Sequence, residues 1–246
     1  MPADCAADHL STHRSPDSKR VPDFFTFASS LQVAAKYEML AIQSRMFDLV
    51  RDAYPETFEG LIPHKPLGES VFSGPAPHPN EVLNLFVQQN FTSALPMAYY
   101  MTARRGLNSL MGGHLPASAR LSSEILQTAV RGLMVLRERE LNGTHRVIFG
   151  PKGSYTCSTS TCPSHGQAGL VTFVIYQRIF DHITGSSQSG TRVLQVPEFY
   201  RGRVRDNTRD WHPGICSNCV ERWVLGHEEL RKKVWTSLPD VFGLRG

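Results

Sequence analysis

Two pairs of cysteines are the residues in this sequence whose type and spacing most clearly indicate chemistry. Cys216 and Cys219 form a C-x₂-C motif, and Cys157 and Cys162 form a C-x₄-C motif among small residues. A C-x₂-C turn that opens a helix can bring two thiolates to one ion, and the helix N-terminus stabilises their charge. Four sulfurs complete a tetrahedral structural site and leave no position open for a substrate. The sequence therefore predicts a structural zinc ion held by these four cysteines.

Other roles for the cysteines remain open. His165 and His212 lie near the pairs in sequence, and either could replace one sulfur. The cysteines could instead be ordinary thiols. A redox disulfide between Cys216 and Cys219 is a further alternative, although no βαβ pattern surrounds them. Cys5 lies in a polar leader, and we interpret it as incidental.

Motifs for catalysis are incomplete in this sequence. Residues 227–231, HEELR, begin like the H-E-x-x-H zinc motif, but Arg231 stands where the second histidine is required. Residues 185–190, GSSQSG, approach a G-x-S-x-G nucleophile elbow but place Ser189 where the closing glycine belongs. Because no spaced set of catalytic groups emerges, the sequence predicts a protein that is not an enzyme.

Composition and charge favour an intracellular protein that does not bind nucleic acid. The 246 residues carry a formal net charge of only +4. The densest basic stretch, Arg201, Arg203 and Arg205, is followed by Asp206 and Asp210, which is typical of a solvated loop. No apolar run reaches the ~18 residues of a membrane span. The leader is too polar for a signal peptide, which predicts an intracellular protein with reduced thiols.

The first half of the chain has the periodicity of an all-α unit. We expect residues 1–22 to be a disordered polar leader and residues 23–143 to be a helical domain. Apolar residues recur at helical spacing from Leu31 to Leu49, which predicts one helix ended by Pro55. It is apolar over more than half its circumference and so needs neighbours on two sides. Further helices are expected at residues 81–89, from Thr92 or Ser93 to 105, and from Ser122 or Ser123 to the Asn142-Gly143 pair.

The second half, residues 144–246, is expected to be a loop-rich cysteine region closed by a long helix. Residues 145–149 predict a short strand, residues 151–169 a loop, and residues 170–183 a buried helix. From Cys219 to about residue 237 we expect the final helix, with one apolar face that packs onto the helical half. That face comprises Trp223, Leu230, Val234 and Leu238. The predicted fold class is therefore mainly α and bundle-like.

Several segments together resemble a family of fungal BTB/POZ-domain proteins, in the region C-terminal to the BTB core. These segments are residues 31–39 (LQVAAKYEM), 52–57 (DAYPET), 77–79 (PHP), 82–85 (VLNL), 95–100 (LPMAYY), the C-x₂-C helix and 235–244 (WTSLPDVFGL). The resemblance covers about nine-tenths of the chain. It rests on the order and spacing of these segments rather than on any single one. It implies a helical extension of the BTB type with a zinc clamp. The strands of a BTB core would precede Phe24, so the resemblance does not carry BTB-type homodimerisation to this chain.

The function that follows is an adaptor module that binds an unknown protein partner and no membrane. The alternative from another class is a zinc-dependent nucleic-acid-binding or transcription-associated protein that uses Arg201, Arg203 and Arg205 beside Cys216 and Cys219. Binding to DNA that weakens with salt would favour that alternative. A third hypothesis is an enzyme with an unrecognised site, which a deep pocket with perturbed acid or base groups would favour.

Overall fold

The described part of the chain is mainly helical, which confirms the predicted fold class at that level. A computed structural model describes residues 22–51, 53–61, 71–111, 114–149, 194 and 217–245. Its elements in chain order are α1 (Phe24–Lys36), α2 (Leu40–Val50), α3 (Pro79–Gln88), α4 (Leu95–Ala103), α5 (Leu107–Met111), η1 (Ala117–Ala119), α6 (Ser123–Phe149) and α9 (Ser217–Val241). Across these ranges, no helix combines the length and the apolar character that a membrane crossing needs.

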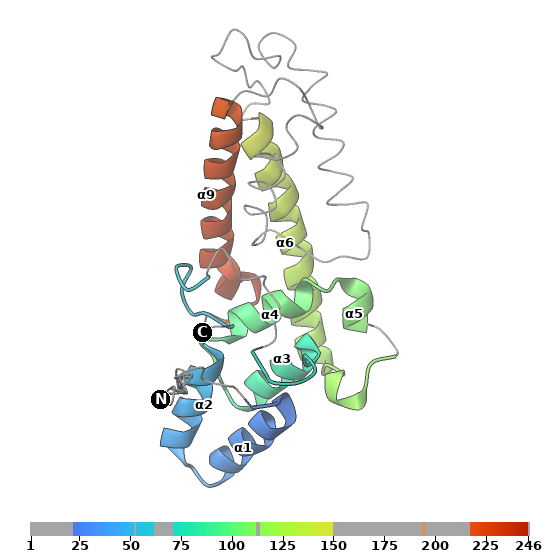
Figure 1. The fold of residues 1–246 in the computed structure, drawn as a ribbon. Helices are drawn as coiled ribbons and strands as arrows, with labels where there is room; N and C mark the ends of the chain where they lie inside the picture. The colour runs from blue at the N-terminus through green and yellow to red at the C-terminus, as the bar shows by residue number, and fades with distance from the viewer. Residues whose placement is uncertain are drawn as a thin grey trace, which may run out of the picture.

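Two long helices form the frame of the molecule. Figure 1 shows α6 and α9 side by side and running in opposite directions. The helix α4 packs against both of them, and α3 packs against α4. The α1–α2 hairpin lies at the end of the molecule where α6 begins (Figure 1). The C-terminal end of α6 and the N-terminal end of α9 therefore meet at the opposite end.

Glycines inside the two long helices let their backbones approach closely. A Cβ atom at Gly132 would overlap the Phe242 ring, and one at Gly143 would overlap the end of the Leu230 side chain. A Cβ at Gly226 would stand 3.0 Å from Val147. Glycine normally weakens a helix by about 1 kcal/mol relative to alanine, because it has more backbone freedom to lose. Here Gly143 and Gly226 make room for a side chain of the facing helix, and Gly132 makes room for Phe242, which directly follows α9.

The predicted end of α6 at Asn142-Gly143 is therefore wrong, and so is the predicted strand at residues 145–149. The helix runs on to Phe149. Gly143 gives room to Leu230 rather than ending the helix, and Thr144 is buried against the body of the protein. Tertiary packing has overridden the local stop signal.

The single helix predicted between Leu31 and Pro55 is two helices. Glu38 adopts a left-handed backbone with φ of 54°. Its N–H donates to the Ala35 carbonyl at 3.2 Å, and the Met39 N–H donates to the Ala34 carbonyl at 2.8 Å. This pair of bonds is the Schellman arrangement that ends a helix. Glycine usually occupies the left-handed position, so a glutamate there gave no signal in the sequence.

The starts of α3 and α4 agree with the sequence more closely. Pro79 is the first residue of α3, and the His78 N–H donates to the Glu81 carboxylate at 2.9 Å. Burial, with Arg105 nearby, lowers the pKa of His78, so the neutral ring accepts from the Asn80 N–H. In α4 the expected proline, Pro96, lies in the first turn. The predicted Thr92 or Ser93 cap is wrong, since the N-cap is Ala94 without a side-chain bond.

The C-terminal helix closes the fold as predicted. Trp223, Val234 and Leu238 are buried, and Leu230 packs partly buried against the same core. Trp235 is partly buried with its ring 6.5 Å from that of Phe58. The α9 stripe is therefore core. Residues 151–169 and 170–183, where a loop and a helix were predicted, lie outside the described residues, as does most of the 1–22 leader.

Candidate functional site

The predicted zinc ligands fall almost entirely outside the described residues. Cys157, Cys162 and Cys216 lie outside them, as do His165, His212 and the basic stretch at residues 201–205. The backbone of Cys219 lies in the first turn of α9, which begins at Ser217. The last three residues of the C-x₂-C motif therefore lie in the first turn of a helix, and Cys216 lies outside the described residues. Among the described side chains, no three His, Cys, Asp or Glu groups come close enough to hold a metal ion.

The tip of the α1–α2 hairpin exposes an unusual amount of apolar surface. We define the hairpin tip as Val33, Tyr37, Met39, Leu40 and Ile42. Tyr37 is 62% exposed and Leu40 is 73% exposed. The Lys36 ammonium lies 5.7 Å from the centre of the Tyr37 ring, so a basic group borders the apolar side chains. Phe25, on the outward side of α1, is 80% exposed.

The hairpin is nevertheless firmly attached to the body through its other face. Phe27, Leu31 and Val50 are fully buried. The Phe47 ring of α2 stacks on Phe91 with ring centres 3.8 Å apart. The Phe27 ring meets Phe72 edge-on at 5.3 Å. The exposed tip therefore projects from a base that packs against the body.

Sequence reasoning missed this tip, although its signal was present. The apolar pattern covered more than half of the helix circumference, which indicated neighbours on two sides. In the structure α1 and α2 pack against each other and the base of the hairpin packs against the body, but several of the other apolar side chains stay exposed. Tyr37 and Leu40 were expected to fill a second packed face, and Ile42 was expected to lie in the buried stripe. All three are exposed, so those expectations are wrong.

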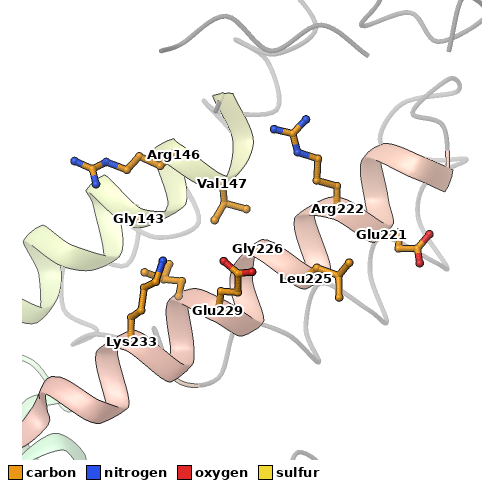
Figure 2. Close-up of a pocket in the computed structure, with 10 residues that line it drawn as sticks. Gly143, Arg146, Val147, Glu221, Arg222, Leu225, Gly226, Glu229 and Lys233 are labelled. Atoms are coloured by element: carbon orange, nitrogen blue, oxygen red, sulfur yellow. The ribbon is translucent and has the colours of Figure 1, made fainter. Parts of the chain in front are cut away.

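A second feature is a groove of about 610 Å³ between the distal ends of α6 and α9. Figure 2 shows Val147 of α6 directed at Gly226 of α9, with the Glu229 carboxylate and the Lys233 ammonium at the mouth. The described residues that line it carry three basic and two acidic side chains: Arg146, Arg222, Lys233, Glu221 and Glu229. None of the described lining residues is a cysteine, serine, threonine or histidine. The described lining of the groove is thus of mixed charge.

The first and last residues of the incomplete H-E-x-x-H motif are buried rather than placed in an accessible site. His227 is 1% exposed and Arg231 is 5% exposed. Arg231 forms an ion pair with Glu228 at 3.0 Å and lies over the Phe58 ring at 5.5 Å. An arginine that is held in this way cannot replace the missing histidine as a zinc ligand. His227 and Arg231 are therefore buried, whereas Glu229 is exposed at the groove.

The buried state of His227 predicts a loss of stability in mild acid. Burial lowers the pKa of His227 from its ordinary value of 6.5 to about 4. Below pH 6.5 the unfolded chain binds a proton that the folded chain excludes. The free energy of unfolding is therefore at its full value above pH 6.5, and it decreases as the pH falls toward 4. The loss between pH 7.5 and 5.0 is expected to be about 2 kcal/mol.

Urea unfolding at these two pH values measures this loss. His227→Gln should remove most of the difference between pH 7.5 and 5.0. His114→Gln, at an exposed position, is the matched control and should leave the difference unchanged. An equal pH dependence in the wild type and in His227→Gln would show that another group is responsible.

Comparison with known proteins adds no relative from which a function could be transferred. Neither a protein-family model, nor a curated protein, nor a solved structure matches this chain.

Proposed function

We propose that this chain is a non-enzymatic adaptor module that binds a protein partner through its hairpin tip and is clamped by a structural zinc ion. This is the class of function that the resemblance to the post-BTB region of fungal BTB/POZ proteins implies. The observation that carries the proposal is the apolar hairpin tip on a firmly packed base. Such a surface fits a macromolecular contact better than it fits catalysis.

The size of the exposed apolar surface supports this proposal. An aromatic side chain offers roughly 150–250 Å² of surface, so Tyr37, which is 62% exposed, presents on the order of 100 Å² at the tip. Val33, Met39, Leu40 and Ile42 add to this. Monomeric proteins rarely expose contiguous apolar patches larger than a few hundred Å², and larger ones mark interaction sites. The occupant we propose is a different protein that presents an apolar groove to the projecting tip.

Chain geometry is compatible with the zinc clamp. The end of α6 and the start of α9 meet at the same end of the molecule, and packed helices lie about 8–10 Å apart. Cys157 follows Phe149 by eight residues, and an extended chain spans up to ~3.3–3.6 Å per residue. This reach allows the pair Cys157 and Cys162 to meet the pair Cys216 and Cys219. Four thiolates would supply a closed site that fixes structure.

Quantitative affinity capture from cells tests the proposed role of the tip. Leu40→Asp should reduce the recovery of the partner at least tenfold. Losing a buried leucine contact costs about 1.5–3 kcal/mol, and each 1.4 kcal/mol is a factor of ten in affinity. Since Leu40 is 73% exposed, the variant should keep the melting temperature of the wild type.

Gln127→Asp is the matched control, because it makes the same charge change at an exposed position of α6. It should leave every captured protein in place. If Leu40→Asp retains the same proteins in the same amounts as Gln127→Asp, the tip is not the binding surface.

A further inference from the structure

Leu194 is the one residue between α6 and α9 that the structure describes, and it lies in the core. It is fully buried, in the same apolar cluster as residues of α4, α6 and α9. A buried residue from a connecting segment brings its backbone N–H and carbonyl out of water, and both groups need partners. The surroundings of Leu194 supply both.

Two side chains from different helices hold the backbone of Leu194. Its N–H donates to the Tyr100 hydroxyl oxygen of α4 at 3.2 Å. Its carbonyl accepts from Arg231 Nε of α9 at 2.9 Å. Both side chains are nearly inaccessible to water, since Tyr100 is 0% and Arg231 is 5% exposed. A single residue is thus bound by its N–H, its carbonyl and its side chain.

The two binding side chains are themselves fixed in place. Arg231 is oriented by its ion pair with Glu228 and by the Phe58 ring beneath its guanidinium group. Burial raises the pKa of Tyr100, so its phenol stays neutral and can accept the Leu194 N–H. Without an occupant, the Arg231 Nε and the Tyr100 hydroxyl would each lose a hydrogen bond inside the core. Leu194 itself lies in a turn, so the arrangement is suited to a turn that presents a leucine.

We propose that Tyr100 and Arg231 form a docking pocket for a peptide turn that presents a leucine side chain, and that Leu194 of the same chain occupies it. The two hydrogen bonds recognise backbone groups that every residue except proline carries. The apolar surroundings select the side chain. This pocket is separate from the hairpin tip, and the proposal does not depend on the proposed function.

The test is complementation of an emptied pocket by a synthetic peptide of residues 189–199. Leu194→Gly in the full chain should lower the melting temperature. The peptide should raise it again in a saturable way. The same peptide with aspartate in place of leucine should not raise it, and the wild type should respond to neither peptide. Adding Tyr100→Phe to Leu194→Gly should weaken peptide binding about fivefold, as expected for one hydrogen bond of ~1 kcal/mol.

A second measurement covers the case in which Leu194→Gly does not fold. Trypsin cleavage after Arg192 should be about fivefold faster in Tyr100→Phe than in the wild type, because release of Leu194 becomes easier. Tyr37→Phe, at an exposed tyrosine, is the control and should be cut at the wild-type rate. The proposal is overturned if Tyr100→Phe is also cut at that rate. It is equally overturned if a folded Leu194→Gly variant gains no stability from ~1 mM peptide, a concentration at which even a weak complex forms.

Discussion

Phe86→Ala is expected to lower the free energy of unfolding by about 3–5 kcal/mol, the usual cost of truncating a buried phenylalanine. Phe86 is fully buried on α3. Its ring meets Tyr54 edge-on at 5.0 Å and Phe91 edge-on at 5.2 Å. Phe91 in turn stacks on Phe47 of α2. The substitution therefore leaves a cavity at the point where the hairpin is joined to the rest of the fold.

Urea denaturation followed by circular dichroism measures this effect. Since domains are usually stable by only ~5–15 kcal/mol, the variant should unfold at a much lower urea concentration. Phe25→Ala is the matched control, because the same atoms are removed from a side chain that is 80% exposed. Its effect should stay within about 0.5 kcal/mol. Equal losses in the two variants would contradict the packing of Phe86 and the exposure of Phe25.

Removal of zinc is expected to have the other large effect. One zinc ion per chain is expected, with the four sulfurs within ~4 Å of each other as ~2.3 Å Zn–S bonds imply. Structural zinc binds with apparent free energies of about 10–16 kcal/mol in small domains, so the ordering of its ligands depends on the ion. Chelation should increase hydrogen exchange first in residues 155–223. The helices between residues 31 and 141 should stay largely protected.

Metal content and hydrogen exchange together test this expectation. Elemental analysis should find one zinc per chain in the wild type and a clear loss in Cys216→Ser. Cys5→Ser removes the cysteine outside the two pairs and should retain the metal. A protein that lacks zinc, or a uniform loss of helicity on chelation, would contradict the four-sulfur site.

Local signals in the sequence were enough to predict several helix starts. Pro96 lies in the first turn of α4 and α9 begins close to Cys219, as the sequence indicated, and α3 begins at Pro79, two residues before the predicted start at residue 81. The capping groups and prolines that define a helix start interact with residues within one helical turn, so they can be read from a short stretch of sequence. The apolar stripe of α9 was also predictable, because its spacing repeats over many residues and its burial in the core follows.

Features that depend on contacts between distant segments were not predictable in the same way. Glycine is a residue type that commonly ends helices, so Gly143 suggested a helix end. Only the structure shows that the Leu230 side chain of the facing helix packs against it. Glu38 takes a left-handed conformation that its residue type does not signal. The exposure of Leu40 depends on which elements lie beside α2, and sequence periodicity cannot supply that information. The Tyr100–Leu194–Arg231 contacts join three separate segments and leave no local pattern.

Photo-crosslinking in cells from the hairpin tip tests the proposed adaptor role most directly. A benzoylphenylalanine placed at position 40 lies on the projecting tip, and one placed at position 127 lies on the exposed surface of α6. Irradiation should join the chain with the probe at position 40 to a different protein. The same probe at position 127 should not form that product. The absence of any product from position 40, equal products from both positions, or a product made only of two copies of this chain would contradict a tip that binds a distinct protein partner.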